Sequence, residues 1–273
     1  MSDSHGFTPS RKVRSAGCFL RPWGFPTTVV QPRIVLSVWD HAVVLAFAVA
    51  LPVYARYNYP RFKRAVESGD GEARSRQYQK TTLRQWVLAS VAALVWFRAG
   101  RTAEELGLGV AFGLRFWIAL GAAAALAFVW RQLFLAAMND EAGRASLVAQ
   151  LRTLQPLLPS TARELRLFIA LSITAGICEE LLFRGYLIGY LTFVIGFPAA
   201  CVLSGVLFGV GHLYQGPRQA AKIIVLGLVF VAFYVGSGSL WIPMALHALL
   251  DAAQGRLAFR LLKSEEKVRG QQE

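Results

Sequence analysis

Long apolar stretches, separated by short polar and basic segments, run along the chain from residue 34 to residue 261. A helix needs about 20 apolar residues to cross the roughly 30 Å hydrocarbon core of a bilayer. The fold class that we expect is therefore all-α, a polytopic helical membrane protein with about seven transmembrane helices, and the pattern allows an eighth. The predicted spans are 34–54, 81–98, 112–135, 164–187, 194–213, 219–236 and 238–261.

Three local signals set boundaries within this pattern. Gly196 and Pro198 interrupt a long uncharged run, and proline is tolerated in the first turn of a helix, so we expect a helix to restart there. The sequence Gly-Ser-Gly-Ser at 236–239 indicates a tight turn between the last two spans. The span 81–98 is short and carries Arg84 near one end, so we expect it to tilt or to begin earlier.

Composition agrees with a membrane protein, because 55% of the residues are hydrophobic and only 16% are charged, less than a soluble domain carries. The net charge of +13 comes from basic residues that cluster at 11–33, 56–80, 131–166 and the C-terminus. These clusters flank the apolar spans, as anionic headgroups and the positive-inside rule favour. We therefore expect a lipid bilayer as a partner, and no nucleic acid.

The same pattern divides the chain into four parts. Residues 1–33 are a basic N-terminal tail that is expected to be poorly ordered, and residues 34–160 hold the N-terminal transmembrane helices and basic loops. Residues 161–262 form a helical core that carries the candidate chemistry, and residues 263–273 are a charged C-terminal tail.

Ionisable side chains inside the apolar stretches are the most informative feature of the chain. A charge at the bilayer centre costs roughly 2.5–3.5 kcal/mol even on insertion scales, so such residues usually serve a function. Carboxylates and imidazoles that converge in a membrane can activate a water molecule or hold an ion. The residues concerned are Glu179, Glu180, Arg184, His212, His247 and Asp251. Asp40 and His41, near the start of the first span, are expected at the membrane interface instead.

Helical spacing separates the roles of the two adjacent glutamates. Glu180 and Arg184 are four residues apart and share a face, whereas Glu179 points about 100° away. We therefore expect Arg184 to neutralise Glu180, and Glu179 to be the free carboxylate that can act as a general base. The alternative is that all three form a buried ionic latch between helices.

The histidines lie on two other spans. His212 ends an apolar stretch one turn after Phe208, where a lone histidine is most often a capping residue. His247 and Asp251 share a face, and a histidine that donates to a carboxylate one turn away has its tautomer fixed. The occurrence of Glu, His and His/Asp on three separate spans favours one shared site.

The ordered motifs E-E-x-x-x-R-G, F-x-x-x-H and H-x-x-x-D on three helices resemble the CPBP family of intramembrane endopeptidases, which comprises the CAAX prenyl proteases and the bacterial Abi proteins. The resemblance covers roughly residues 160–255. It implies hydrolysis of a peptide bond of a membrane-associated protein by a multi-pass protein, which we expect in a bacterial cell membrane. The roles that it implies are catalytic for Glu179 and His212, oxyanion stabilisation for His247 and Asp251, and supporting positions for Glu180, Arg184 and Phe208.

One position departs from the family pattern, since the eukaryotic prenyl proteases have Asn where this chain has Asp251. An amide can donate a hydrogen bond to an oxyanion, and an ionised carboxylate cannot. Asp251 is therefore protonated, orients His247 or binds a metal. The cofactor stays open. It is none if the enzyme is glutamate-dependent, which we favour, and zinc if Glu179, His212, His247 and Asp251 supply the ligands.

Other functions have weaker support in the sequence. Ser237 and Ser239 could pair with a histidine, but their glycine-rich context is typical of a turn. Cys18, Cys178 and Cys201 have no spacing typical of disulfides or thiolate metal sites. A proton-coupled transporter would use the same carboxylates and imidazoles, although no internal repeat is visible between the two halves of the sequence. A non-catalytic membrane partner is the third alternative.

Overall fold

The computed structural model describes residues 36–269, and every regular element in that range is a helix. The predicted all-α fold class is confirmed, and the predicted N-terminal tail lies outside the described residues. The helices are α1 (Val38–Leu45), α2 (Leu51–Glu67), α3 (Ala73–Arg98), α4 (Leu114–Asn139), α5 (Glu141–Thr153), α6 (Ala162–Glu180), α7 (Ile188–Ile195), α8 (Phe197–Val210), α9 (Pro217–Ser237) and α10 (Trp241–Arg269). Two π-helical segments, η3 (Ala46–Ala50) and η5 (Leu181–Leu187), and two short 3₁₀ segments, η4 (Gln155–Leu157) and η6 (Leu213–Gln215), complete them.

The chain is an integral membrane protein with an exposed apolar surface. Among the described helices, three are long and apolar enough to cross a bilayer by length and composition, namely Val38–Glu67, Leu114–Asn139 and Pro217–Ser237. The predicted spans 81–98, 164–187 and 238–261 carry charged or ionisable residues, whereas the helix within the predicted span 194–213, Phe197–Val210, is apolar but shorter. The count of seven spans therefore stays a prediction.

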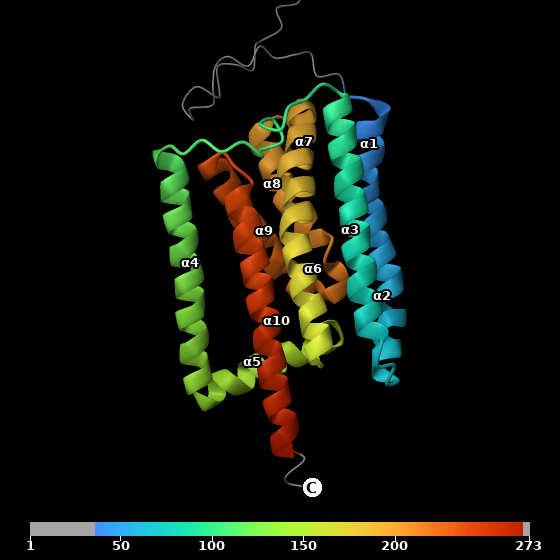
Figure 1. Cartoon of the computed structure of the whole chain (residues 1–273), viewed down its shortest axis with the longest axis vertical. Coiled ribbons are helices and arrows are strands. Elements are labelled where there is room, and N and C mark those ends of the chain that lie inside the picture. The colour runs from blue at the N-terminus through green and yellow to red at the C-terminus, as the bar shows by residue number, and fades with distance from the viewer. Residues whose placement is uncertain (1–35, 270–273) are drawn as a thin grey trace, which may run out of the picture. The chain divides into compact units, whose positions relative to one another are not determined.

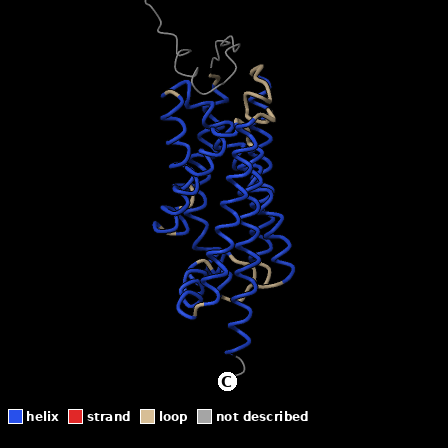
Figure 2. The backbone as a smooth tube through the Cα atoms, turned by 90° about the vertical axis from the view of Figure 1, so that its left-hand side faces the viewer, coloured by secondary structure: helices blue, strands red, loops and turns tan. Residues whose placement is uncertain are grey.

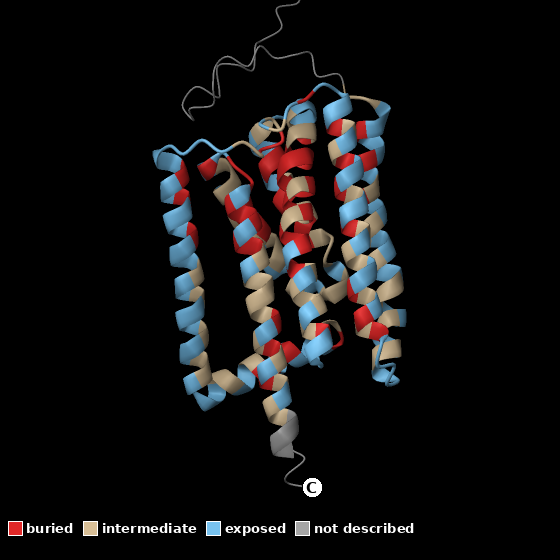
Figure 3. Cartoon of the chain, viewed as in Figure 1, coloured by how far each residue is buried: buried red, intermediate tan, exposed pale blue. Residues whose placement is uncertain are grey.

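Helix α6 occupies the middle of the bundle formed by residues 37–269, since it packs against α3 on one side and α10 on the other. Helices α8 and α9 pack against each other, and α4 packs on α9. Figure 1 shows the long helices side by side, with α5 crossing their lower end, and Figure 2 shows that the loops lie mostly at the ends of the helices. Burial is concentrated on the inner helices, whereas α4 exposes most of its length (Figure 3).

The helix boundaries follow the signals in the sequence with one exception. Gly196, at a φ of 82°, ends α7, and Pro198 lies in the first turn of α8, so the predicted restart is confirmed. Gly238, in the left-handed region, ends α9 and confirms the predicted turn. The predicted end of a helix at residue 187 is wrong, because α6 continues through η5 and α7 as far as Ile195. No residue before Gly196 breaks that run.

Two further helix ends bear on the expected pattern. The α3 helix begins at Ala73, eight residues before the predicted span, so the expectation that this span begins earlier is confirmed, and Arg84 lies within the helix. The α10 helix continues to Arg269, so residues 263–269 of the expected C-terminal tail are helical. A capping box at Thr161 and Glu164 starts α6, since each residue's side chain accepts from the backbone of the other.

Asp40 is fully buried inside the protein, and its position at the membrane interface stays a prediction. The Arg101 guanidinium donates to both of its carboxylate oxygens, at 2.7 and 2.9 Å, and the Tyr186 hydroxyl donates at 2.6 Å. These partners come from the segment after α3 and from η5, so local spacing could not reveal them. The neighbouring His41 is exposed, and its Nδ1 lies 2.7 Å from the Tyr190 hydroxyl.

Glycines allow the close helix contacts that build the centre of the bundle. A Cβ on Gly176 of α6 would lie 2.7 Å from the carbonyl oxygen of Met244 and 2.8 Å from the amide nitrogen of Ala248, both in α10. A Cβ on Gly209 of α8 would lie 2.6 Å from the amide nitrogen of Ile224 in α9. Small residues at such positions let membrane helices approach closely. The contact at Gly176 brings α10 against the end of α6, where the two glutamates lie.

Candidate active site

The four predicted catalytic residues line one cavity of about 330 Å³. They come from three parts of the core segment: Glu179 from α6, His212 from the turn after α8, and His247 and Asp251 from α10. Helices α2 and α3 close the other side of the cavity. A space of this volume lies at the lower end of the range for sites that bind small molecules or peptide side chains.

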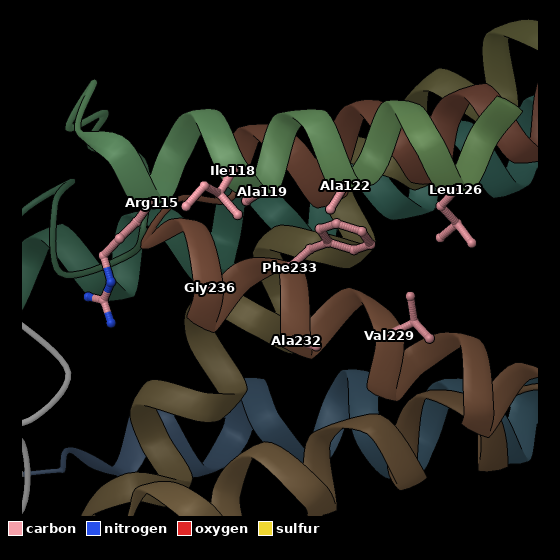
Figure 4. A pocket seen from close by; sticks show the side chains of 9 residues that line it. All are labelled: Arg115, Ile118, Ala119, Ala122, Leu126, Val229, Ala232, Phe233 and Gly236. Carbon is pink, nitrogen blue, oxygen red and sulfur yellow. The ribbon is translucent and has the colours of Figure 1, made fainter.

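A second hollow contains none of these residues. It is a groove of about 490 Å³ between α4 and α9. Figure 4 shows apolar side chains of the two helices facing each other across it, among them Ile118, Leu126 and Phe233, with Arg115 at one end. Its lining offers no carboxylate, imidazole or nucleophile, so we assign the candidate chemistry to the other cavity.

Glu180 and Arg184 form a buried ion pair behind the cavity. Both side chains are fully buried, and Arg184 Nη1 donates to Glu180 Oε1 at 3.0 Å, so the predicted pairing is confirmed. Arg184 Nη2 donates to the carbonyl oxygen of Gly227 in α9 at 2.9 Å, and the guanidinium lies 4.3 Å from the centre of the Phe208 ring. The pair therefore joins the start of η5 to α8 and α9. The contact of the Arg184 guanidinium with the Phe208 ring is consistent with the predicted supporting position of Phe208.

His247 is held by Glu180, so Asp251 does not orient it through a hydrogen bond, which was one of the three roles left open for Asp251. Its Nδ1 donates to Glu180 Oε1 at 2.9 Å, and its ring stacks on Phe230 with centroids 5.0 Å apart. The nearest oxygen of Asp251 is 3.7 Å from Nε2, too long for a hydrogen bond but within ion-pair distance. Because a carboxylate only accepts, the proton on the neutral ring lies at Nδ1, and Nε2 carries the lone pair.

His212 is oriented by its own backbone turn. Its Nδ1 donates to the carbonyl oxygen of Phe208 at 2.8 Å, and its ring lies 5.1 Å from the Phe208 ring. A carbonyl oxygen only accepts, so the free lone pair of the neutral imidazole is at Nε2. His212 thus makes a capping contact and also lines the cavity. The interpretation of His212 as a capping residue is therefore compatible with its interpretation as part of the site.

Glu179 has a partner that sequence reasoning missed. Gln85 of α3, only 6% exposed, donates from Nε2 to Glu179 Oε1 at 2.5 Å. No other hydrogen bond links the Glu179 side chain to a described residue. The sequence does show a polar amide next to Arg84 within a short apolar span, and this could have marked Gln85 as unusual. No spacing rule, however, connects Gln85 with a residue 94 positions away.

A zinc site formed by the four candidates does not fit this arrangement. Within residues 36–269, no three His, Cys, Asp or Glu side chains are grouped as a metal ion requires. Nδ1 of each histidine is engaged, by Glu180 for His247 and by the Phe208 carbonyl for His212, and this leaves Nε2 of both rings free. Because the described residues form no group of three ligands, we derive no step through a metal. Cys178 and Cys201 are free thiols, in agreement with the absence of a disulfide spacing.

Comparison with known proteins identifies the core segment. Residues 161–253 match the family model Rce1-like, described as type II CAAX prenyl endopeptidase Rce1-like. This segment is Rce1-like. The resemblance to the CAAX proteases that the three motifs predict is thereby confirmed, and the matched family is one of peptidases. No curated protein and no solved structure matched the chain.

The matched segment holds all seven predicted site residues, from Glu179 to Asp251. Helices α2 and α3, which close the cavity from the other side, lie before it. Gln85 therefore contacts the Rce1-like segment from outside.

Proposed function

We propose that the chain is an intramembrane endopeptidase that hydrolyses a peptide bond of a membrane-associated protein. The observation that carries the proposal is that Glu179, His212 and His247 line one cavity within a segment that matches a peptidase family. Glu179 is the carboxylate left for chemistry, because the Arg184 guanidinium is bound by Glu180. The resemblance to Abi proteins implies a bacterial cell membrane as the location.

In the proposed reaction, Glu179 acts as the general base on a water molecule, and His212 shares the proton through Nε2. The water oxygen attacks the carbonyl carbon of the peptide as its proton moves to Glu179, and the carbonyl electron pair becomes an oxyanion. The proton then passes to the amide nitrogen, the C–N bond breaks, and the amine leaves. One proton is thus taken from water and returned to the leaving group, with no other reactant needed.

His247 supplies the donor for the oxyanion in this proposal. When the ring is protonated, Nε2–H can donate while Nδ1–H remains bound to Glu180, so the imidazole keeps its orientation during the step. Asp251, at 3.7 Å from Nε2, stabilises the protonated ring without a hydrogen bond. Because His247 and not Asp251 donates to the oxyanion in this proposal, a carboxylate at position 251 is compatible with the reaction, although the eukaryotic family members have Asn there.

A non-catalytic latch is the second candidate, and the buried contacts of Glu180 with Arg184 and His247 favour it for those three residues. A latch alone gives no reason for Glu179 and His212, which take no part in these contacts, to line a cavity together with His247. An endopeptidase explains both the catalytic candidates, Glu179 and His212, and the buried contacts of Glu180, which then serve to orient His247.

The test is cleavage of a quenched fluorescent peptide by the purified full chain in lipid nanodiscs. The matched family of CAAX prenyl endopeptidases suggests a probe that ends in a farnesylated CAAX sequence, together with the same peptide without the farnesyl group. We expect Glu179→Gln to lower the cleavage rate by about 10²–10⁴-fold, the usual contribution of a general base. Glu141→Gln, an exposed change in α5, is the matched control and should keep the rate.

Cleavage that is unaffected by Glu179→Gln would refute the proposed role of this carboxylate. Comparison of the two peptides shows whether a prenyl group is required. If neither peptide is cleaved, the search for a substrate turns to membrane proteins that accumulate uncut in cells lacking the chain.

A further inference from the structure

Gln85 is a buried amide that reaches the candidate base from outside the Rce1-like segment. It lies in α3 and lines the same cavity as Glu179 and both histidines. Its Nε2 is 2.5 Å from Glu179 Oε1, a short contact for a neutral donor and a carboxylate. The side chain is 6% exposed, so water outside the cavity cannot compete for this contact.

The orientation of the amide follows from its partner. A carboxylate has only acceptors, so the amino group of Gln85 must face Glu179 and the carbonyl oxygen Oε1 must point elsewhere. That oxygen is buried and accepts no hydrogen bond from any described residue. A buried acceptor without a donor is destabilising, and in native proteins it usually has a role.

The backbone that carries Gln85 is held firmly against α6. The Trp86 indole N–H donates to the Thr174 hydroxyl oxygen at 3.2 Å, five residues before Glu179. One turn after Gln85, Ala89 is buried. Two turns before Gln85, the Tyr78 ring packs edge-on against Phe168 of α6, and its hydroxyl donates to the Leu157 carbonyl in η4 at 2.8 Å. These contacts on both sides give the amide a defined position relative to the carboxylate.

We propose that Gln85 is a positioning residue for the hydrolysis proposed above. Its amino group fixes one oxygen of Glu179, and its Oε1 accepts a hydrogen bond from the attacking water. The other hydrogen of that water is then directed to Glu179, and an oxygen lone pair is left for the substrate carbonyl. Gln85 neither gains nor loses a proton, so the balance of the reaction is unchanged. The inference rests on the proposed function, which it extends to a residue outside the matched segment.

The first test is Gln85→Leu, which keeps the size of the side chain and removes both polar atoms. We expect kcat to fall by about 10²–10³-fold, as for the loss of one oriented polar group in other active sites, and KM to stay within about threefold. The matched control is Gln79→Leu on the exposed side of the same helix, which should leave both constants unchanged. A wild-type kcat for Gln85→Leu, or a loss confined to KM, would overturn the proposal.

A double variant separates positioning from a purely structural role. If Gln85 acts through Glu179, then Gln85→Leu combined with Glu179→Gln should be no slower than Glu179→Gln alone. A structural role would instead multiply the two losses and lower the thermal stability in nanodiscs. If Gln85→Leu does not fold, Gln85→Glu keeps shape and polarity but replaces the donor with an acceptor, and the same loss of kcat is expected.

An experiment without substrate distinguishes failure of this inference from failure of the proposed function. Dicyclohexylcarbodiimide modifies protonated carboxyl groups in apolar surroundings, and mass spectrometry locates the adduct. Because the amide donor favours ionised Glu179, Gln85→Leu should speed modification of Glu179 several-fold at neutral pH, whereas Gln79→Leu should not. Equal rates in all three proteins would refute the contact, whether or not the chain is a peptidase.

Discussion

Glu180 Oε1 accepts a hydrogen bond from His247 Nδ1 at 2.9 Å, which links the end of α6 to α10. The same oxygen accepts from Arg184 Nη1 at 3.0 Å, so one carboxylate oxygen lies between a guanidinium and an imidazole. All three side chains are at least 95% buried, so both hydrogen bonds form away from water. The ion pair of the E-E-x-x-x-R-G motif is thereby connected directly to the candidate oxyanion donor.

The two adjacent glutamates should differ in what their loss costs. Glu179→Gln should lower the cleavage rate by about 10²–10⁴-fold and leave the stability nearly unchanged, because Glu179 has no buried cation partner. Glu180→Gln leaves a buried guanidinium without its counter-charge, a change that costs about 3–5 kcal/mol, and it should lower the unfolding temperature along with activity. The measurement is kcat/KM beside thermal unfolding in the same nanodiscs. Equal loss of activity in two equally stable variants would contradict this division.

The contact between α6 and α10 should be sensitive to a single methyl group. A Cβ on Gly176 would overlap the backbone of Met244 and Ala248, so Gly176→Ala should push the helices apart and cost about 1–3 kcal/mol. It should also lower kcat, because the Glu180–His247 hydrogen bond spans the same contact. Gly121→Ala is the matched control: no atom lies within 4 Å of its added Cβ, and it should be neutral or slightly stabilising. Wild-type activity and stability of Gly176→Ala would show that the helices are not so closely packed.

The buried pair of Asp40 and Arg101 predicts a stability effect far from the cavity. Arg101→Ala leaves the Asp40 carboxylate buried with only hydroxyl and backbone partners, and it should destabilise the protein by about 3–5 kcal/mol. Asp40→Asn combined with Arg101→Met removes both charges and should recover much of the loss. Thermal unfolding of the wild type, the single variant and the double variant provides the measurement. A double variant less stable than Arg101→Ala would argue against an uncompensated charge as the cause.

Sequence spacing predicted contacts within a helix better than contacts between helices. The i, i+4 rule gave the Glu180–Arg184 pair correctly, because both partners lie on one continuous helical segment. It failed for His247, which has an acceptor at i+4 in Asp251 but takes Glu180, 67 positions away. The close approach at Gly176 decides between these partners, and no local pattern encodes the distance between two helices.

The prediction of the helices shows the same contrast. Residue types located the helices, but they did not identify which residues contact one another. Apolar runs and glycine breaks located the helices, since these signals are local. The partners of Gln85 and Asp40 were missed because they lie 94 and 61 positions away in the sequence. The continuation of α6 through the π-helical segment η5 had no sequence signal either. A π-helical turn depends on how the backbone accommodates neighbouring helices, and such turns often occur at functional sites.

The last prediction concerns Asp251, where the chain departs from the prenyl-protease pattern. Its carboxylate lies 3.7 Å from His247 Nε2 and is 38% exposed, while Glu180 holds the ring from the other side. In a metal-free site, Asp251→Asn should therefore keep most of the activity, because the orientation of His247 does not depend on it. If Asp251 were instead a zinc ligand, the amide would bind the metal far more weakly, and activity and bound metal would fall together.

Two measurements on the same samples separate these cases. Cleavage by the wild type and by Asp251→Asn is measured before and after exhaustive chelation, and the metal content of each sample is determined. We expect both proteins to remain active after chelation, since the described residues offer no group of three ligands for a metal ion. Wild-type activity that vanishes on chelation and returns with added zinc would overturn the metal-free mechanism. It would also mean that Glu179, His212 and His247 move into a different arrangement when the ion binds.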